Sequence, residues 1–592
     1  MTCYQHFLVF ALVFTFLSSA SRSAATSPSF ARSYGREPPK GVNGGFGCLA
    51  CTVVVALLEQ MSVIHNETFV KSYYRLCNAY PGLYREPCIA LGEFFIPQII
   101  DLITKKTSAD VICHAIQLCY REKGQPYCHA FPRNDFHEEL LRSREVVSSP
   151  FTFEKSASDY QSKDQAAFNP CTLPGVKPLC DKFQNVFENQ DLSLFDWDKD
   201  TYFPSVESWR GISWRGRDCN DLDAFHHPGA KPKDGDVFFD SNCNGIHGID
   251  LVKGKPYEDL FCKDTGYLGL IVVGDSAAAN FHIPPEWVTA RLISGKVFQN
   301  FSFILGNEFD WPQLSGFSGY LRESRWPEEK GHDIDSIYLK LWERNHCNHR
   351  DYQNLARNGA ASFDANLLIK SMARDQKRDQ PALVFYAFFA NDVCTCEADL
   401  HNMTTPEEMH KNVMETLRSL DKRLPNGSHV ILLSLVDGRF IYETVHKHIH
   451  PVGELRGDLT YESLFNFLNC LQISPCFGWL NSNATIRNET SERAARLSEV
   501  LKFVAKTTKF ENFDVNFLNL SLEELIEEWK SKGGDAFELF EPFIGFHPSL
   551  KAQTLAAEIV WRKLESNSPH VLGNINPSND MIKKVFGNQG GY

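Results

Sequence analysis

The sequence predicts an α/β protein whose catalytic core is preceded by a small all-α domain and an acidic segment. Three observations carry this prediction. Six cysteines lie between residues 48 and 119 among apolar residues at helical spacing. Acidic residues alternate with other residues between 196 and 250, and short apolar runs alternate with amphipathic stretches from residue 263 onward. Alternating strands and helices form a parallel sheet with helices on both faces.

The length of 592 residues and the hydrophobic content of 43% suffice for two or three domains with buried cores. Asp and Glu number 73 against 60 Lys and Arg, which gives a net charge of -13. A nucleic-acid partner is therefore not expected, because such proteins neutralise phosphates with a basic face.

Residues 1–20 are expected to be a signal peptide. The apolar run Phe7–Leu17 precedes the small residues Ser18 to Ala20, and the other dense apolar run, 50–58, is too short to span a bilayer. We therefore expect a secreted protein or one of the lysosomal or another vesicle lumen. Seven N-x-Ser/Thr sequons fit this compartment and predict glycosylation at Asn66, Asn300, Asn402, Asn426, Asn483, Asn488 and Asn519.

Residues 45–130 are predicted to form a helical domain held by disulfides. Helical apolar spacing runs through 48–58, 86–107 and 107–119, and an oxidising compartment favours cystine over a zinc site. The spacings C-x2-C, C-x10-C and C-x5-C resemble the saposin-like family. This resemblance implies contact with lipids or a membrane surface, and it implies the pairs Cys48–Cys119, Cys51–Cys113 and Cys77–Cys88. The alternative is that the apolar faces form only the domain's own core.

The stretch 131–169 is polar and rich in serine, and we predict a linker that carries a proteolytic processing site. Arg142, Arg144 and Lys155 are the candidate cleavage positions. Cys128 lies outside the six-cysteine set, so it is placed to tie the helical domain to the rest of the chain.

Residues 170–255 are predicted to bind Ca²⁺. Oxygen ligands alternate along Asp196–Tyr202 and again along 240–246, as they do in loops for hard cations. The stretches D-C-N-D, P-G and D-x-N-C-N-G resemble the calcium repeats of extracellular proteins, whereas no loop combines the glycine and glutamate of an EF-hand. The alternative is a solvated acidic loop. The predicted ligands are Asp196, Asp198, Asp200, Tyr202, Asp218, Asn220, Asp221, Asp223, Asp236, Asp240, Asn242, Asn244, Ile246 and Asp250.

The catalytic core is predicted over 263–592. Strands are expected at 268–273, 382–389, 429–435 and 515–520, and helices at 406–420 and 492–506. Ser276 follows the first strand at a strand-to-helix turn, where its hydroxyl is exposed and backbone N–H groups can meet an oxyanion. The surrounding residues match neither a trypsin-like protease nor a G-x-S-x-G elbow.

The order Gly274-Asp-Ser276, Gly359, Asn391 and His547 resembles the GDSL, or SGNH, hydrolases. The resemblance implies a flavodoxin-like domain in which Ser276 is the nucleophile and His547 the base. It also implies that Gly359 and Asn391 hold the oxyanion together with the serine N–H. The chemistry agrees, because neutral donors stabilise the charge that develops on an ester carbonyl, and histidine accepts a proton near neutral pH.

Two positions depart from the family pattern. Ile544 stands where an aspartate usually precedes the histidine by three residues, so either a Ser-His dyad or a substitute acid is expected, with Glu541 the nearest upstream. Phe389 stands where a glycine usually precedes the asparagine, and its ring could crowd an acyl pocket. Cys396 is the candidate for an unpaired thiol.

The order of the modules resembles a family of lipid hydrolases that remove secondary fatty acyl chains from the lipid A of bacterial lipopolysaccharide and so detoxify it. It implies a precursor cut into two disulfide-linked subunits, and for that bridge we expect Cys128 to pair with Cys470 or Cys476. Stretches such as Asp240–Gly245 and Trp311–Gly316 carry this resemblance. The alternatives are a lipid-binding protein with a weakened hydrolase fold and a phospholipase of the same fold.

Overall fold

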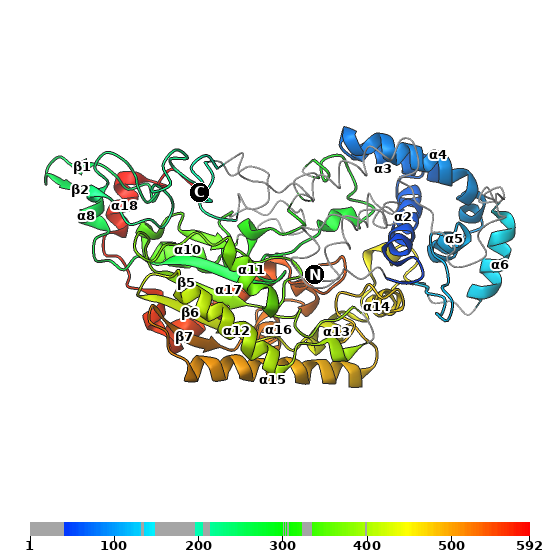
Figure 1. The fold of residues 1–592 in the computed structure, drawn as a ribbon. Helices are drawn as coiled ribbons and strands as arrows, with labels where there is room; N and C mark the ends of the chain where they lie inside the picture. The colour runs from blue at the N-terminus through cyan, green and yellow to red at the C-terminus, as the bar shows by residue number, and fades with distance from the viewer. Residues whose placement is uncertain are drawn as a thin grey trace, which may run out of the picture.

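A computed structural model describes residues 41–131, 135–147, 196–204, 214–299, 301, 304, 307–321, 334–396 and 399–592. The expected signal peptide, Lys155 and Asn300 lie outside these residues. In Figure 1 the N-terminal helices lie at one end of the molecule, the parallel sheet lies in the middle, and a loop-rich lobe lies at the other end.

The N-terminal helices form a compact saposin-like module. They are α2 (Gly45–Ile64), α3 (Phe69–Ala79), α4 (Gly82–Thr104), α5 (Ala109–Ala115) and α6 (Phe136–Val146). The disulfides Cys48–Cys119, Cys51–Cys113 and Cys77–Cys88 are the three that the resemblance implies. Two helical stretches, 45–64 and 84–104, are long and apolar enough to cross a bilayer, and 72% and 39% of their most apolar windows are buried in the fold.

The predicted linker over 131–169 is wrong in its first part, because residues 136–146 form α6. Phe136 and Leu140 are buried on α6 and pack against Val111 of α5. A short helix of this kind is hard to recognise in a polar sequence, because only one of its faces needs apolar residues. Arg142 and Arg144 lie exposed on this helix.

The second domain is built on a five-stranded sheet with strand order β4-β3-β5-β6-β7, and every neighbouring pair is parallel. Numbered along the chain this is the order 2-1-3-4-5 of flavodoxin-like folds, as the resemblance implies. The strands are β3 (Gly269–Gly274), β4 (Tyr352–Asn354), β5 (Ala382–Ala387), β6 (Ser428–Leu433) and β7 (Phe513–Leu518). β4 is too short and polar to stand out in the sequence.

Helices cover both faces of this sheet, with α12 and α15 on one side and α10 and α17 on the other (Figure 1). β3 and β5 are buried at every position, which explains why their sequences read as unbroken apolar runs. The helices of this domain are α10 (Ile337–Arg344), α11 (Ala365–Lys370), α12 (Pro406–Asp421), α13 (Arg439–Val445), α14 (Tyr461–Cys470), α15 (Ala484–Thr507), α16 (Leu522–Ser531), α17 (Leu550–Asn567) and α18 (Asn579–Phe586).

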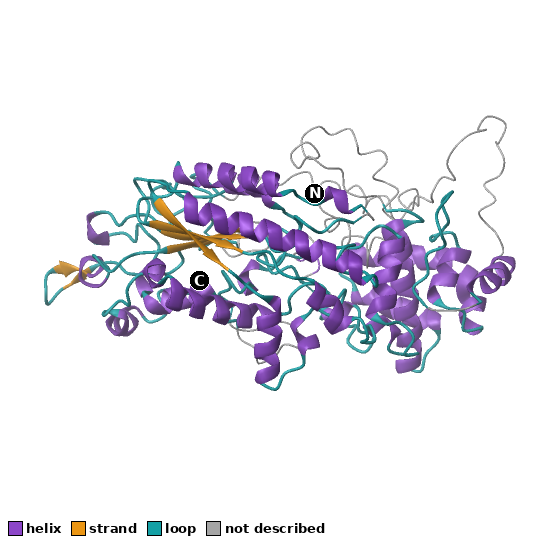
Figure 2. Ribbon diagram, turned by 90° about the horizontal axis from the view of Figure 1, so that it is seen from below, coloured by secondary structure: helices purple, strands orange, loops and turns teal. Residues whose placement is uncertain are grey.

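The acidic segment forms loops, the short hairpin of β1 (Ile249–Asp250) and β2 (Lys255–Pro256), and helix α8 (Tyr257–Phe261). Figure 2 shows this hairpin at the end of the molecule away from the saposin-like helices. The disulfides Cys219–Cys243 and Cys262–Cys347 hold the segment together and fix it to the catalytic domain.

The saposin-like module and the catalytic domain share one continuous core. Gln60 of α2 donates hydrogen bonds to the carbonyls of Pro451 and Val452 at 3.0 and 2.7 Å. Cys128 forms a disulfide with Cys470, one of the two partners expected for it. The other, Cys476, is bound to Cys394. The expectation of a free thiol at Cys396 is wrong, because this cysteine is disulfide-bonded.

Candidate active site

The turn after β3 brings Ser276 and His547 together, although 271 positions separate them in the chain. His547 Nε2 lies 3.1 Å from Ser276 Oγ, and both residues are buried. Because β3 ends at Gly274, the serine sits at the carboxyl end of the sheet, where ligands bind in open α/β folds. Burial first, and then the nearby His282, lowers the pKa of His547 to about 3.

Asp275 of the Gly-Asp-Ser motif ties the nucleophile turn to the loop that follows β5. Its carboxylate accepts N–H bonds from Phe389 at 2.7 Å and Ala390 at 3.1 Å, and from Ala277 at 3.1 Å. This role was missed in the sequence, although the acid between Gly274 and Ser276 was a visible signal. Burial raises the pKa of Asp275 to about 7.

Each predicted oxyanion donor keeps an N–H group that the described residues do not use. Among the described residues, the N–H groups of Ser276 and Gly359 donate no hydrogen bond to the protein, so both can serve a ligand. Gly359 has φ +82°, a conformation that favours glycine. The Asn391 side-chain amide donates one bond to the carbonyl of Ala360 at 2.9 Å, which orients it and leaves its second N–H for a substrate.

Glu541 organises the loop that carries His547. Its carboxylate accepts N–H bonds from Phe543 at 2.7 Å and Ile544 at 3.1 Å, and its own N–H donates to the His547 carbonyl at 2.9 Å. The acid therefore holds the backbone of the loop. Ile544 is 1% exposed and packs in the core, where an aspartate in its place would need a partner.

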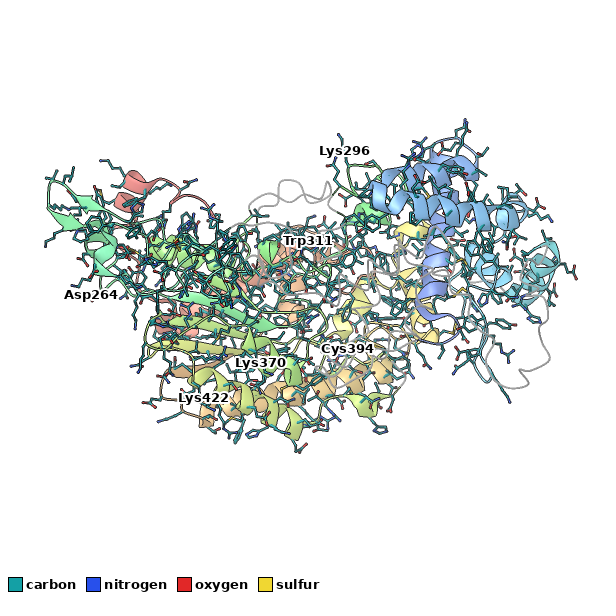
Figure 3. All side chains as sticks on the ribbon, turned by 45° about the horizontal axis from the view of Figure 1, so that its top comes forward. Asp264, Lys296, Trp311, Lys370, Cys394 and Lys422 are labelled. Carbon is teal, nitrogen blue, oxygen red and sulfur yellow. A yellow bond between two sulfur atoms is a disulfide. The ribbon has the colours of Figure 1, made fainter. Side chains whose placement is uncertain are left out.

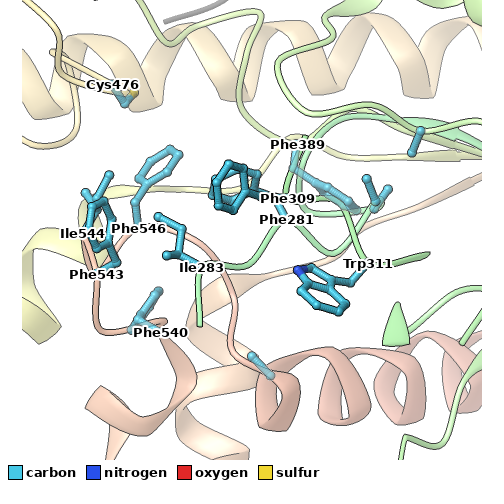
Figure 4. Packing of buried hydrophobic residues seen from close by; sticks show 14 of the residues in the cluster. Phe281, Ile283, Phe309, Trp311, Phe389, Cys476, Phe540, Phe543, Ile544 and Phe546 are labelled. Atoms are coloured by element: carbon cyan, nitrogen blue, oxygen red, sulfur yellow. The ribbon is translucent and has the colours of Figure 1, made fainter. Parts of the chain in front are cut away.

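An apolar cavity opens beside the serine and histidine and extends along α16 and α17. It encloses about 950 Å³, including the part open to solvent. Phe389 forms part of its wall, as expected from its place before Asn391, and Phe317 lies parallel to it. Figure 4 shows buried phenylalanines of the core, of which Phe389, Phe540 and Phe546 line this cavity. The cavity walls further from the serine come from Ile441, Trp479, Leu522, Leu525, Ala556 and Val560.

Aromatic rings connect the saposin-like module to the histidine. Tyr84 contacts Phe301 at 4.7 Å between ring centroids, and Phe301 contacts Trp287 at 5.1 Å. From Trp287 the contacts continue through Phe309 at 5.9 Å to Phe281, whose ring lies 4.4 Å from that of His547. Figure 3 places Lys296, which belongs to the same segment, beside the helices of the saposin-like module.

The acidic segment gathers five of the predicted calcium ligands. The carboxylates of Asp196, Asp198 and Asp200 approach one another within 4.8 Å, and Asp198 lies equally close to Asp218 and Asp221. One oxygen each of Asp196, Asp198, Asp200 and Asp218 is buried without a hydrogen-bond partner. Burial and then the neighbouring acids raise the pKa of Asp200 to about 8. Orphaned buried oxygens in an all-oxygen donor set fit a hard cation such as Ca²⁺.

The second predicted calcium loop, residues 240–246, is held by hydrogen bonds to Glu258. This acid lies on α8, outside the loop, so the spacing of the loop residues does not reveal it. Glu258 accepts hydrogen bonds from the amides of Asn242 at 2.9 Å and Asn244 at 3.2 Å. Asp240 accepts the N–H groups of Asn244 and Gly245, and the N–H of Ile246 binds the Asn244 side chain.

Three predicted ligands are directed elsewhere. Asp223 pairs with His226 at 2.8 Å, the side chain of Asp236 binds Ser241, and Asp250 accepts the N–H of Val252 in the hairpin turn. The N–H of Asn220 binds Asp218, and the buried Tyr202 hydroxyl accepts a bond from Gln353. Asx-type turns and ion pairs use the same acids as metal loops, so spacing alone does not separate them.

The six sequon asparagines in the described part of the chain are all exposed, which leaves each one accessible to a glycan. They are Asn66, Asn402, Asn426, Asn483, Asn488 and Asn519.

Comparison with known proteins agrees with this architecture. Residues 47–181 match the model of the saposin-like domain, and residues 270–560 match that of the GDSL-like lipase/acylhydrolase. Acyloxyacyl hydrolase of Homo sapiens is 44% identical over 93% of this chain and 94% of its own length. The chain belongs to the acyloxyacyl hydrolase family.

The mouse acyloxyacyl hydrolase is 43% identical over 94% of this chain, and the rabbit protein is 41% identical over 95%. Both also align over nearly their whole length, at 95% and 96%. The chain is therefore a hydrolase that combines a saposin-like domain with a GDSL acylhydrolase domain, which makes it an esterase that deacylates lipids.

Proposed function

We propose that this acyloxyacyl hydrolase releases secondary fatty acyl chains from lipid A of bacterial lipopolysaccharide, with Ser276 as the nucleophile. The observation that carries the proposal is the 3.1 Å contact between Ser276 Oγ and His547 Nε2 at the mouth of an apolar cavity. A fatty acyl chain is the ligand that such a cavity suits, because it offers apolar walls and donors only at one end.

In the proposed reaction His547 Nε2 takes the proton of Ser276 as Oγ bonds to the ester carbonyl carbon. The carbonyl oxygen becomes an oxyanion, for which the N–H groups of Ser276 and Gly359 and the Asn391 amide are the donors. The C–O bond then breaks, and His547 returns the proton to the leaving alcohol. Water, deprotonated by the same histidine, releases the fatty acid and restores the serine.

The saposin-like module would bring lipid to this site. The stretch 84–104 is apolar, yet only 39% of its most apolar window is buried. Phe94, Ile100 and Ile103 on this helix are only partly buried, so they are the apolar side chains that would contact lipid. The aromatic contacts from Tyr84 to His547 connect this helix to the histidine through the packed core.

Three further proposals concern the bound cation, the cellular location and the proteolytic processing of the protein. Ca²⁺ would be held by Asp196, Asp198, Asp200, Asp218 and Asp221, where it supplies positive charge that orders the loops. A secreted or lysosomal location agrees with the exposed sequons and the disulfides. If the precursor is cut between the modules, Cys128–Cys470 would keep the two subunits joined.

The test is fatty-acid release from lipopolysaccharide by the wild type, by Ser276→Ala and by Ser566→Ala, whose serine is exposed on α17. We expect release that falls at least about 1,000-fold in Ser276→Ala and is unchanged in Ser566→Ala. Release from phospholipid vesicles but not from lipopolysaccharide would make the chain a phospholipase. Lipid binding without release by any variant would make it a sequestering protein.

A further inference from the structure

A second cluster of ligating side chains lies on the catalytic domain, away from the acidic segment. His429 of β6, Asp514 of β7 and His570 of η13 (Pro569–Leu572) each direct one nitrogen or oxygen atom to the same point, and these atoms lie within 4.8 Å of one another. His429 and Asp514 are register partners on adjacent parallel strands, so their side chains share one face of the sheet.

The donor set is two imidazoles and one carboxylate. His570 Nε2 lies 2.8 Å from Asp514 Oδ2, and His429 Nδ1 contacts the other oxygen of this carboxylate. The two imidazole rings are 5.6 Å apart between centroids and nearly perpendicular. Two nitrogens and one oxygen on three separate segments are the ligands that Zn²⁺ takes when its fourth position stays open.

The surroundings hold the ligands in place. Asn516 donates to Asp514 Oδ2 at 2.8 Å, and Ser568 Oγ donates to the side-chain Oδ1 of Asn516 at 3.3 Å. The His429 side chain is 19% exposed and that of His570 57%, which leaves an ion access from solvent.

We propose that His429, Asp514 and His570 form a binding site for Zn²⁺ or a similar transition-metal ion. The site is structural, because His429 and Asp514 lie near the amino ends of their strands while Ser276 follows the carboxyl end of β3. Because His570 closely follows α17, a bound ion would link the end of this helix to strands β6 and β7. α17 begins just after His547 and lines the apolar cavity, so the metal link would stabilise the position of this helix.

The test uses Co²⁺ as a probe on the full-length protein in excess Ca²⁺. Tetrahedral Co²⁺ with imidazole ligands absorbs visible light, whereas Co²⁺ on oxygen-only sites absorbs weakly. No described cysteine is free to give a thiolate band. We expect absorption that saturates at one Co²⁺ per chain, is displaced by Zn²⁺, and is lost in His429→Ala and His570→Ala. The control His410→Ala removes an exposed histidine on α12 and should keep the band.

Thermal unfolding gives a second readout. Zn²⁺ should raise the Tm of the wild type and of His410→Ala, but not that of Asp514→Asn, which keeps the shape of the side chain and removes its charge. Circular dichroism and the rate of ester hydrolysis would show that the variants fold. If the wild type gives no band and no rise in Tm, the three residues form only a hydrogen-bonded ion pair and the proposal is overturned.

Discussion

The buried imidazole of His547 sets the expected pH dependence at the scale of single residues. Burial and His282 lower its pKa to about 3, so the neutral, proton-accepting form persists in mildly acid solution. We expect kcat/KM for a soluble ester to stay within about twofold from pH 7 to pH 5 and to fall only below that range. A pH-rate profile on the Ca²⁺-saturated protein tests this. A fall centred at pH 6.5 would contradict it.

Glu541 acts on the reaction through the backbone that positions His547. Glu541→Ala removes the acceptor of two loop N–H groups, each worth about 1–3 kcal/mol when left unsatisfied in the interior. We expect kcat to fall roughly 10-fold or more with little change in KM, and Glu541→Gln, which keeps one acceptor oxygen, to recover most of the loss. Glu565→Gln, at an exposed position of α17, is the matched control. A KM effect alone would contradict the positioning role.

The clustered acids predicted to bind Ca²⁺, Asp196, Asp198, Asp200, Asp218 and Asp221, show within one loop segment how burial and charge oppose each other. Without a cation the pKa of Asp200 is raised to about 8 and that of Asp218 to about 7. A carboxyl with a raised pKa destabilises the fold as pH rises from about 4 to that value. Ca²⁺ should therefore raise Tm more at pH 8 than at pH 5, and calorimetry with Ca²⁺ or a chelator measures this.

Asp200→Asn separates this repulsion from a structural role of the side chain. The amide can still accept the Tyr202 N–H, but it removes one of the crowded charges. We expect the variant to be more stable than the wild type in chelator and to gain less from Ca²⁺. Asp264→Asn, outside the clustered carboxylates, serves as the control. An equal gain in stability from Ca²⁺ in the variant and the wild type would contradict a cation site at these residues.

We expect the cavity along α17 to select among acyl chains by length. Ala556 and Ala557 line it where their small side chains leave space. In Ala556→Leu the added carbons fill part of this space, so long chains lose contact that short chains never make. We expect kcat/KM for long-chain esters to fall roughly 10-fold while that for a short-chain ester stays unchanged. Equal losses for both substrates would show that the substitution disturbs the serine instead.

The interface between the saposin-like module and the catalytic domain involves the whole molecule. Cys128–Cys470, the Gln60 hydrogen bonds and the shared core fix the saposin-like helices against the catalytic domain. In Cys128→Ser with Cys470→Ser, we expect hydrolysis of lipopolysaccharide aggregates to fall several-fold and that of a soluble short-chain ester to persist. Both substrates should be assayed on the same preparation. Equal retention of both activities would show that the joint does not deliver lipid.

The modules, and Ser276 and His547 as the candidate reacting residues, could be predicted from the sequence alone. Buried strands read as apolar runs, cysteine spacing is specific to the saposin-like helices, and Ser276 and His547 stand in motifs that local patterns reveal. α6 was missed because its apolar face holds few residues, and β4 because it is short.

The hydrogen-bond and ion-pair partners of these side chains follow from the tertiary structure, because the contacts join segments that are distant in the sequence. It turned Glu541 toward the loop backbone, gathered Asp198 with Asp218, and brought His429 to His570. Spacing along the chain predicts neighbours on one helix or strand, whereas packing determines which oxygen or nitrogen atoms meet across the core.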